Sequence, residues 1–80
     1  MSLQEKYLER MMLVLRELSR RPLSRIELQA RFLDRFDSPS AFEATFMFLV
    51  RNGRIQKGGP EYRSPYTITE RGHKLLTGLS

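Results

Sequence analysis

The sequence contains no cysteine and only one histidine, His73. Without cysteine it has no disulfide framework, no thiolate metal site and no cysteine nucleophile, as is usual for proteins of reducing, intracellular compartments. We therefore expect a cytoplasmic protein. One histidine alone provides neither a metal site nor a catalytic triad, since both need several converging side chains.

Long apolar runs, phosphate-binding loops and paired carboxylates are also missing. The longest apolar runs, such as Met11 to Leu15, are far shorter than the ~20 residues of a membrane span, and the start of the chain has no signal-peptide pattern. The glycines at 58 and 59 lack the Gly-x4-Gly-Lys-Ser/Thr spacing of a phosphate-binding loop. Asp34 and Asp37 bracket an expected turn. We therefore expect no membrane association, no metal or cofactor, and no enzymatic activity.

What the chain does have is an excess of positive charge. Fourteen Lys and Arg residues against nine Asp and Glu residues give a net charge of +5 and a pI near 10.2. Eleven of the fourteen are arginine, whose planar guanidinium suits bidentate contacts to phosphate and guanine. The charge favours a polyanionic partner, and the alternative is a basic surface that only keeps the protein soluble. The size and the 40% hydrophobic content indicate one small globular domain over residues 1–80.

Apolar residues at helical spacing predict a first helix over residues 3–20. Its apolar stripe consists of Tyr7, Leu8, Met11, Val14, Leu15 and Leu18. The helix is expected to end before Pro22, because the residue preceding a proline is steered away from the helical region. Leu23 then follows as a short extended segment, which is the candidate first strand of a small sheet.

Two further helices are predicted from their caps. Ser24 and Glu27 match a capping box, so a second helix is expected from residue 25 to about 35 or 36. Ser38 as cap and proline at the next position start a third helix, which runs to about residue 52. Gly53 then occupies the place of a left-handed C-terminal cap.

The last third of the chain predicts a two-stranded ribbon and a closing helix. One strand begins at Ile55, a polar Gly/Pro-rich loop covers residues 57–61, and the returning strand covers residues 65–68. Thr69 is placed to cap the final helix. Gly72 inside that helix costs about 1 kcal/mol against alanine, which indicates close packing against another element.

This order of elements resembles the winged helix-turn-helix superfamily. The patterns that carry the resemblance are Leu49-x3-Gly53-x-Ile55 at the exit of the third helix and Tyr66-x-Ile68-Thr69-x2-Gly72 before the closing helix. Both are similar to patterns of PadR-like, MarR-like and small archaeal winged-helix regulators. The resemblance spans about residues 5 to 79 and implies an α+β, mainly α fold with three helices, a two-stranded wing and a C-terminal helix.

The resemblance also implies binding to double-stranded DNA, as in a small transcriptional regulator or accessory factor. In such domains the third helix lies in the major groove, while the wing brings cations to the DNA backbone. The expected backbone contacts come from Arg25, Ser38, Arg51, Arg54, Lys57 and Arg63. The expected base contacts come from Ser40, Ala41, Ala44 and Thr45.

The third helix also permits a second hypothesis. With Phe42, Phe46 and Leu49 in the core, its outward face is almost uncharged, whereas a major-groove reader usually offers Arg, Asn, Gln or Lys. Met47 and Phe48 on that face would then dock a protein partner or a second copy of the chain, unless they pack against the first helix or the wing.

The first helix provides a second candidate contact surface. Met12 and Leu13 widen its apolar stripe beyond what the neighbouring helices are expected to cover. This width leaves open a homodimer through the first helix.

Overall fold

The computed structural model describes residues 3–36 and 38–78. Over these residues the chain is mainly helical with a two-stranded antiparallel sheet, which confirms the predicted α+β, mainly α class. The elements in chain order are α1 (Leu3–Arg20), α2 (Arg25–Arg31), α3 (Pro39–Arg51), β1 (Ile55–Lys57), β2 (Tyr66–Ile68) and α4 (Glu70–Thr77). In the part of the chain that is described, no helix is long and apolar enough to cross a membrane.

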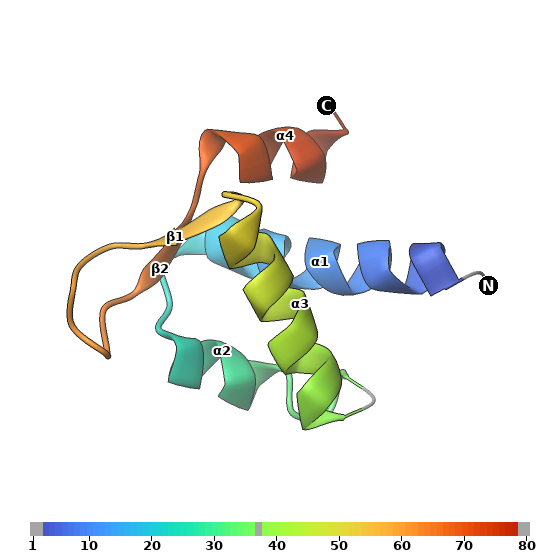
Figure 1. Cartoon of the computed structure of the whole chain (residues 1–80), viewed down its shortest axis with the longest axis horizontal. Helices are drawn as coiled ribbons and strands as arrows, with labels where there is room; N and C mark the ends of the chain where they lie inside the picture. Colours follow the sequence, from blue (N-terminus) through green and yellow to red (C-terminus); the bar gives the residue numbers. More distant parts are fainter. Residues whose placement is uncertain (1–2, 37, 79–80) are drawn as a thin grey trace.

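α1 is the central element of the fold (Figure 1). It packs against α3, α4 and β2, and the β1–β2 hairpin projects beyond its C-terminal end. Val14, Leu15 and Leu18 of α1 are at most 3% exposed and recur at helical spacing. The C-terminal part of the predicted apolar stripe, from Met11 to Leu18, therefore packs against the other elements, whereas Tyr7 and Leu8 are 46% and 45% exposed.

A row of aromatic rings joins α2, α3 and the hairpin. Phe32, Phe36, Phe42 and Phe46 contact one another in sequence, with ring centroids 5.6 to 6.4 Å apart. Tyr66 of β2 packs edge-on against Phe46 at 4.8 Å. Such contacts add to the burial of large apolar surfaces, so this row fixes α3 relative to both neighbours.

α2 is shorter than the capping pattern and the periodicity predict. It ends at Arg31 with Phe32 as its C-terminal cap, and turns replace the expected helix to residue 35 or 36. After these turns the rings of Phe32 and Phe36 are both buried and both lie against Phe42. Burying a large apolar side chain contributes about 1.5–3 kcal/mol, which outweighs the small helix propensity of a few residues.

The hairpin is attached to the rest of the chain through its second strand. β1 and β2 pair with Ile55 opposite Ile68 and Lys57 opposite Tyr66. On its other side Tyr66 pairs with Leu23, accepting from the Leu23 N–H at 3.2 Å and donating its own N–H to the Leu23 carbonyl at 2.7 Å. The extended segment expected at Leu23 is therefore a single bridge, and it ties the link between α1 and α2 to the hairpin.

The helix caps lie where the sequence predicts them. Ser24 accepts from the Glu27 N–H at 3.2 Å, and the Glu27 carboxylate accepts from the Ser24 N–H at 2.9 Å. The Ser24 N–H that donates to the carboxylate is the main cause of a lowered pKa of Glu27, and the Ser24 side chain adds to it. Ser38 and Thr69 cap α3 and α4, and Gly53 has a φ of +67°, as expected of a left-handed cap.

Gly72 lies against the turn between α3 and β1. A Cβ at this position would lie 2.7 Å from the Ile68 Cγ1 atom and closer still to the carbonyl oxygen of Arg54. The close packing predicted for Gly72 is confirmed, and it lets α4 approach the base of the hairpin.

Candidate nucleic-acid interface

α3 turns one side to the core and the other outward. Its buried residues are Phe42, Thr45, Phe46 and Leu49. The opposite side, called here the outward strip of α3, consists of Ser40, Ala44, Met47 and Arg51. All of these except the half-buried Met47 are exposed, so the strip offers small side chains along most of its length and a cation at its end.

Two of the predicted base readers lie off this strip. Thr45 is only 4% exposed, and its hydroxyl donates to the carbonyl oxygen of Ala41 at 2.9 Å. A side chain buried to this degree is poorly placed for the base contact predicted for Thr45. Ala41 itself is half-buried and packs partly against the core. Ser40 and Ala44 are the predicted readers that stay exposed.

Ser38, which is predicted to contact a phosphate, lies at the start of α3. Its side chain is exposed, and its hydroxyl oxygen accepts from the Ala41 N–H at 3.1 Å. The hydroxyl is thus engaged in capping α3 and can still donate its own hydrogen outward.

An ion pair connects α2 to α3 beside the outward strip. Arg25 pairs with Glu43, the only acidic residue of α3, and its guanidinium carbon lies 5.6 Å from the centroid of the Phe46 ring. The two side chains are 36% and 45% exposed. Arg25 is therefore held by α3, and any phosphate contact that it makes competes with Glu43. The role of Glu43 could not be predicted from the spacing of residues in the sequence, because the ion pair forms between two different helices.

The hairpin presents two of the predicted phosphate contacts. Lys57 at the end of β1 is half-buried, and its Nζ lies 6.0 Å from the ring centroid of the exposed Tyr62. Arg63 is exposed in the loop. The Gly58 N–H donates to the Pro65 carbonyl at 2.7 Å, which extends the pairing of the hairpin past Lys57. Both cations are thus attached to a hydrogen-bonded ribbon.

Further arginines gather where α3 ends. Arg51 is exposed in the last turn of α3, and Arg54 follows in the turn to β1, with its N–H bonded to the Leu49 carbonyl at 2.9 Å. Within the described residues the Nε of Arg54 is buried without a hydrogen-bond partner. Arg71 of α4 reaches the same turn, with one guanidinium nitrogen 3.7 Å from where a Cβ on Gly53 would lie. Sequence reasoning did not select Arg71, because α4 meets this turn only in the folded chain.

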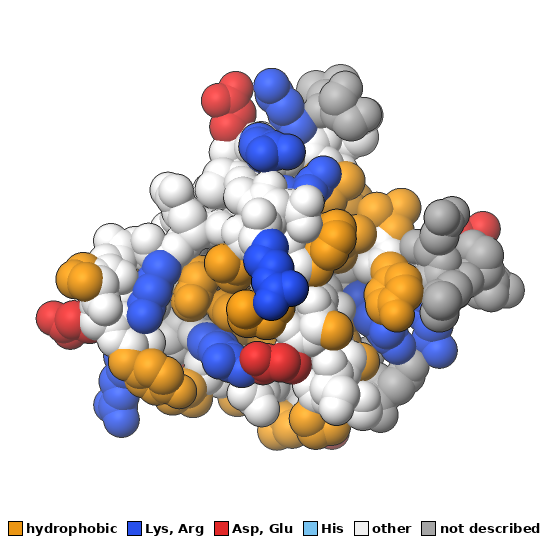
Figure 2. Space-filling model, in the orientation of Figure 1, with side chains coloured by type: hydrophobic (Ala, Val, Ile, Leu, Met, Phe, Trp, Pro, Cys, Tyr) orange, Lys and Arg blue, Asp and Glu red, His pale blue; other side chains and the backbone are white. Residues whose placement is uncertain are grey.

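Lys and Arg side chains are spread over the face seen in Figure 2. They lie over the hairpin, over α3 and over α4, with apolar and uncharged surface between them. Few acidic side chains are visible on this face. Many of the Lys and Arg side chains that give the chain its positive charge therefore lie around the outward strip of α3.

No family model, curated protein or solved structure matches the chain. Its function is therefore inferred from its own residues and their arrangement.

The apolar pair predicted for protein contact is divided by the fold. Met47 is half-buried and packs against the core, whereas Phe48 is 46% exposed. Phe48 borders a groove of about 550 Å³ between α3 and the N-terminal half of α1, which Tyr7, Met11 and Ala44 also line. On α1, Leu13 packs partly against the core, and Met12 is half-buried.

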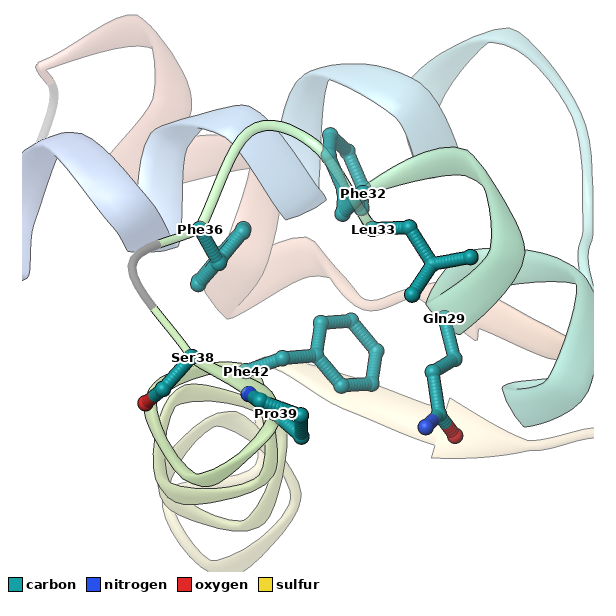
Figure 3. A pocket seen from close by; sticks show the side chains of 7 residues that line it. All are labelled: Gln29, Phe32, Leu33, Phe36, Ser38, Pro39 and Phe42. Carbon is teal, nitrogen blue, oxygen red and sulfur yellow. The ribbon is translucent and has the colours of Figure 1, made fainter.

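The joint between α2 and α3 encloses a much smaller space (Figure 3). Its volume is about 20 Å³, and its lining comes from Gln29, Phe32, Leu33, Phe36, Ser38, Pro39 and Phe42. This is room for about one water molecule and too little for an organic ligand. Among residues 3–36 and 38–78 there is also no cluster of His, Asp and Glu side chains that is suited to a metal ion.

Proposed function

We propose that this chain is a winged helix-turn-helix domain that binds double-stranded DNA, with α3 in the major groove and the hairpin as the wing. The observation that carries the proposal is the placement of cations around a helix face that is uncharged up to its last turn. Arg51 and Arg54 lie at the C-terminal end of the outward strip, and Lys57 and Arg63 lie on the neighbouring hairpin. A helix with cations at its C-terminal end and on the neighbouring hairpin suits a surface of regularly spaced phosphates.

The outward strip of α3 makes contacts with bases that are few and weak. Ser40 is able to hydrogen-bond a base edge or a phosphate, and the methyl group of Ala44 suits contact with a thymine methyl. Neither side chain makes the bidentate contacts that dominate sequence discrimination. Backbone contacts by the cations therefore provide most of the affinity, with a modest sequence preference from α3.

The Arg25–Glu43 pair has a defined place in this arrangement. Glu43 would repel phosphates if it stood alone on α3, and the guanidinium of Arg25 neutralises it at the surface. Because Glu43 holds Arg25, we now expect Arg25 to contribute less to DNA contact than the cations of the hairpin.

The proposal is tested by fluorescence anisotropy with a labelled duplex of mixed sequence over a salt series. Contacts by Arg51, Arg54, Lys57 and Arg63 predict a slope of log K against log salt of about −3 to −4, since each neutralised phosphate contributes about −0.9. Affinity should then fall by about 100-fold between about 50 and 200 mM salt. Replacing Lys57 or Arg63 by alanine should make the slope shallower by about one.

A matched control comes from α4. Lys74→Ala removes the same charge from a side chain that lies 3.8 Å from Glu70 on the same helix, and it should leave the salt slope unchanged. Absence of binding at about 50 mM salt would refute the proposal, as would binding that is indifferent to salt, because phosphate neutralisation must release counterions.

The exposed Phe48 favours a second candidate function, a protein-interaction module that uses α3. Because Met47 packs inward, Phe48 is the residue of the pair that is available for such a contact. Phe48→Ser should then abolish association with a partner or a second copy while leaving DNA affinity intact. Unchanged association in sedimentation velocity would exclude this use of α3.

A further inference from the structure

Four charged residues on the outer side of α1 are arranged symmetrically about its middle. The N-terminal half carries Glu5 and Glu9, the C-terminal half carries Arg16 and Arg20, and all four side chains are exposed. The centre of symmetry is the point between Met12 and Leu13. Glu9 and Arg16 are equally far from it along the chain, and so are Glu5 and Arg20. We call these six residues the outer strip of α1.

The outer strip lies opposite the core. At 3.6 residues per turn its four charged positions fall on one side of α1, and the buried Val14, Leu15 and Leu18 fall on the other. Most of the outer strip lines a shallow depression of about 320 Å³ together with Leu8, which is 45% exposed. The strip therefore combines a hollowed, partly apolar centre with acidic and basic ends.

We propose that two copies of this chain associate through the outer strips of their α1 helices, packed antiparallel about a twofold axis. In a twofold interface each surface patch meets the same patch on the other copy. The symmetric spacing then places Glu9 of one copy opposite Arg16 of the other, with Glu5 opposite Arg20 further out. Met12 of each copy lies opposite Leu13 of the other at the centre.

Charge complementarity selects this orientation. A parallel pair would set glutamate against glutamate and arginine against arginine, and like charges across a helix pair are unfavourable. Interaction with the helix dipole explains Glu5 in the first turn and Arg20 in the last turn. It does not explain Glu9 and Arg16, since that effect is confined to the terminal turns.

The expected association is weak and sensitive to salt. α1 has 18 residues and is about 27 Å long at 1.5 Å per residue, so one helix face buries less area than a standard stable interface. We expect a dissociation constant on the order of 10–100 μM. It should rise with ionic strength, because exposed ion pairs are screened.

The test is sedimentation equilibrium of the full chain over about 1 to 500 μM, a range that brackets this dissociation constant. Glu9→Arg alone and Arg16→Glu alone should each weaken self-association about 10-fold or more, since each sets like charges against each other twice. An equimolar mixture of the two variants should associate as tightly as the wild type. In the mixed pair the introduced arginine faces the introduced glutamate, and the remaining native charges still face each other.

Glu61→Arg in the exposed hairpin loop is the matched control, with the same charge change as Glu9→Arg, and it should not alter association. Circular dichroism of each variant checks that the helices are retained. A wild-type chain that stays monomeric at about 500 μM would overturn the proposal. So would single variants that associate like the wild type, or a mixture that does not recover. The test contains no DNA, so its result is independent of the proposed DNA binding.

Discussion

Replacement of Gly72 by alanine sets helix propensity directly against packing. Alanine at an exposed interior position of a helix is about 1 kcal/mol more favourable than glycine, so a free α4 would gain stability. In the folded chain the added methyl carbon meets Ile68 Cγ1 at 2.7 Å, whereas relaxed carbon atoms lie about 3.5–4.0 Å apart. The Ile68 side chain must therefore move by about 1 Å.

The second obstacle at Gly72 is a backbone atom. The carbonyl oxygen of Arg54 lies in the way of the new methyl group and accepts the Thr69 N–H at 3.0 Å. It cannot retreat without weakening the hydrogen bond that precedes α4. Overpacking of this kind costs typically 1–3 kcal/mol, and the backbone contact places Gly72→Ala in the upper part of this range, at about 2–3 kcal/mol. After the gain in helix propensity, we expect a net destabilisation of about 1–2 kcal/mol.

Thermal and urea unfolding followed by circular dichroism measure this effect. For a domain of this size, about 1–2 kcal/mol corresponds to a fall in Tm of roughly 5–15 °C. His73→Ala, at the neighbouring exposed position of α4, is the control and should stay within about 0.5 kcal/mol of the wild type. A Gly72→Ala chain as stable as the wild type, or more stable, would show that the contact between α4 and the turn after α3 is looser than described.

Three further predictions concern the core, the ion pair and the second helix. Phe46→Ala should lower the free energy of unfolding in urea by about 3–5 kcal/mol, because the Phe46 side chain is 1% exposed. Phe48→Ala should lower it far less, because Phe48 is 46% exposed. Equal losses of stability would contradict the assigned orientation of α3. Glu43→Gln should change stability by less than about 1 kcal/mol. It should tighten DNA binding measured by anisotropy because it frees Arg25, so weaker binding would argue against competition between Glu43 and phosphate for Arg25. The lowered pKa of Glu27 means that its stabilising contribution is present above the pKa of the unfolded chain and is lost as the pH falls through the folded value. Glu27→Gln should therefore lower the Tm more at neutral pH than in acid, and a deficit that is independent of pH would contradict the contribution of this carboxylate to the capping box.

The starts of the helices could be predicted from the sequence because the groups that define them are local. Ser24, Ser38 and Thr69 each cap a helix with a side chain that reaches an N–H three residues further on. Gly53 is similarly determined by its own backbone conformation. The end of α2 was not predictable in this way, since it depends on rings packing against Phe42 from another helix.

The candidate site was predictable only in part, for the same reason. Periodicity assigns the buried face of α3, but Thr45 lies at the edge of that face, and the position of α1 decides whether it is covered. Arg25 could be predicted as a cation at a helix start, yet its partner Glu43 lies 18 residues away in the chain. Arg71 reaches Gly53 only because Gly72 lets α4 lie close to the turn.

The two-sided pairing of Tyr66 has a consequence for how the surface tolerates change. Its N–H and carbonyl bond to Leu23 on one edge, and it lies opposite Lys57 in the hairpin on the other, while a hairpin alone is marginally stable. Three stretches of chain are thus held at a constant separation by main-chain groups that do not depend on side-chain identity. Surface residues of the hairpin can therefore be exchanged without altering its distance from the link that precedes α2. Evolution or design can therefore change the side chains of this surface while the spacing of its main chain stays the same.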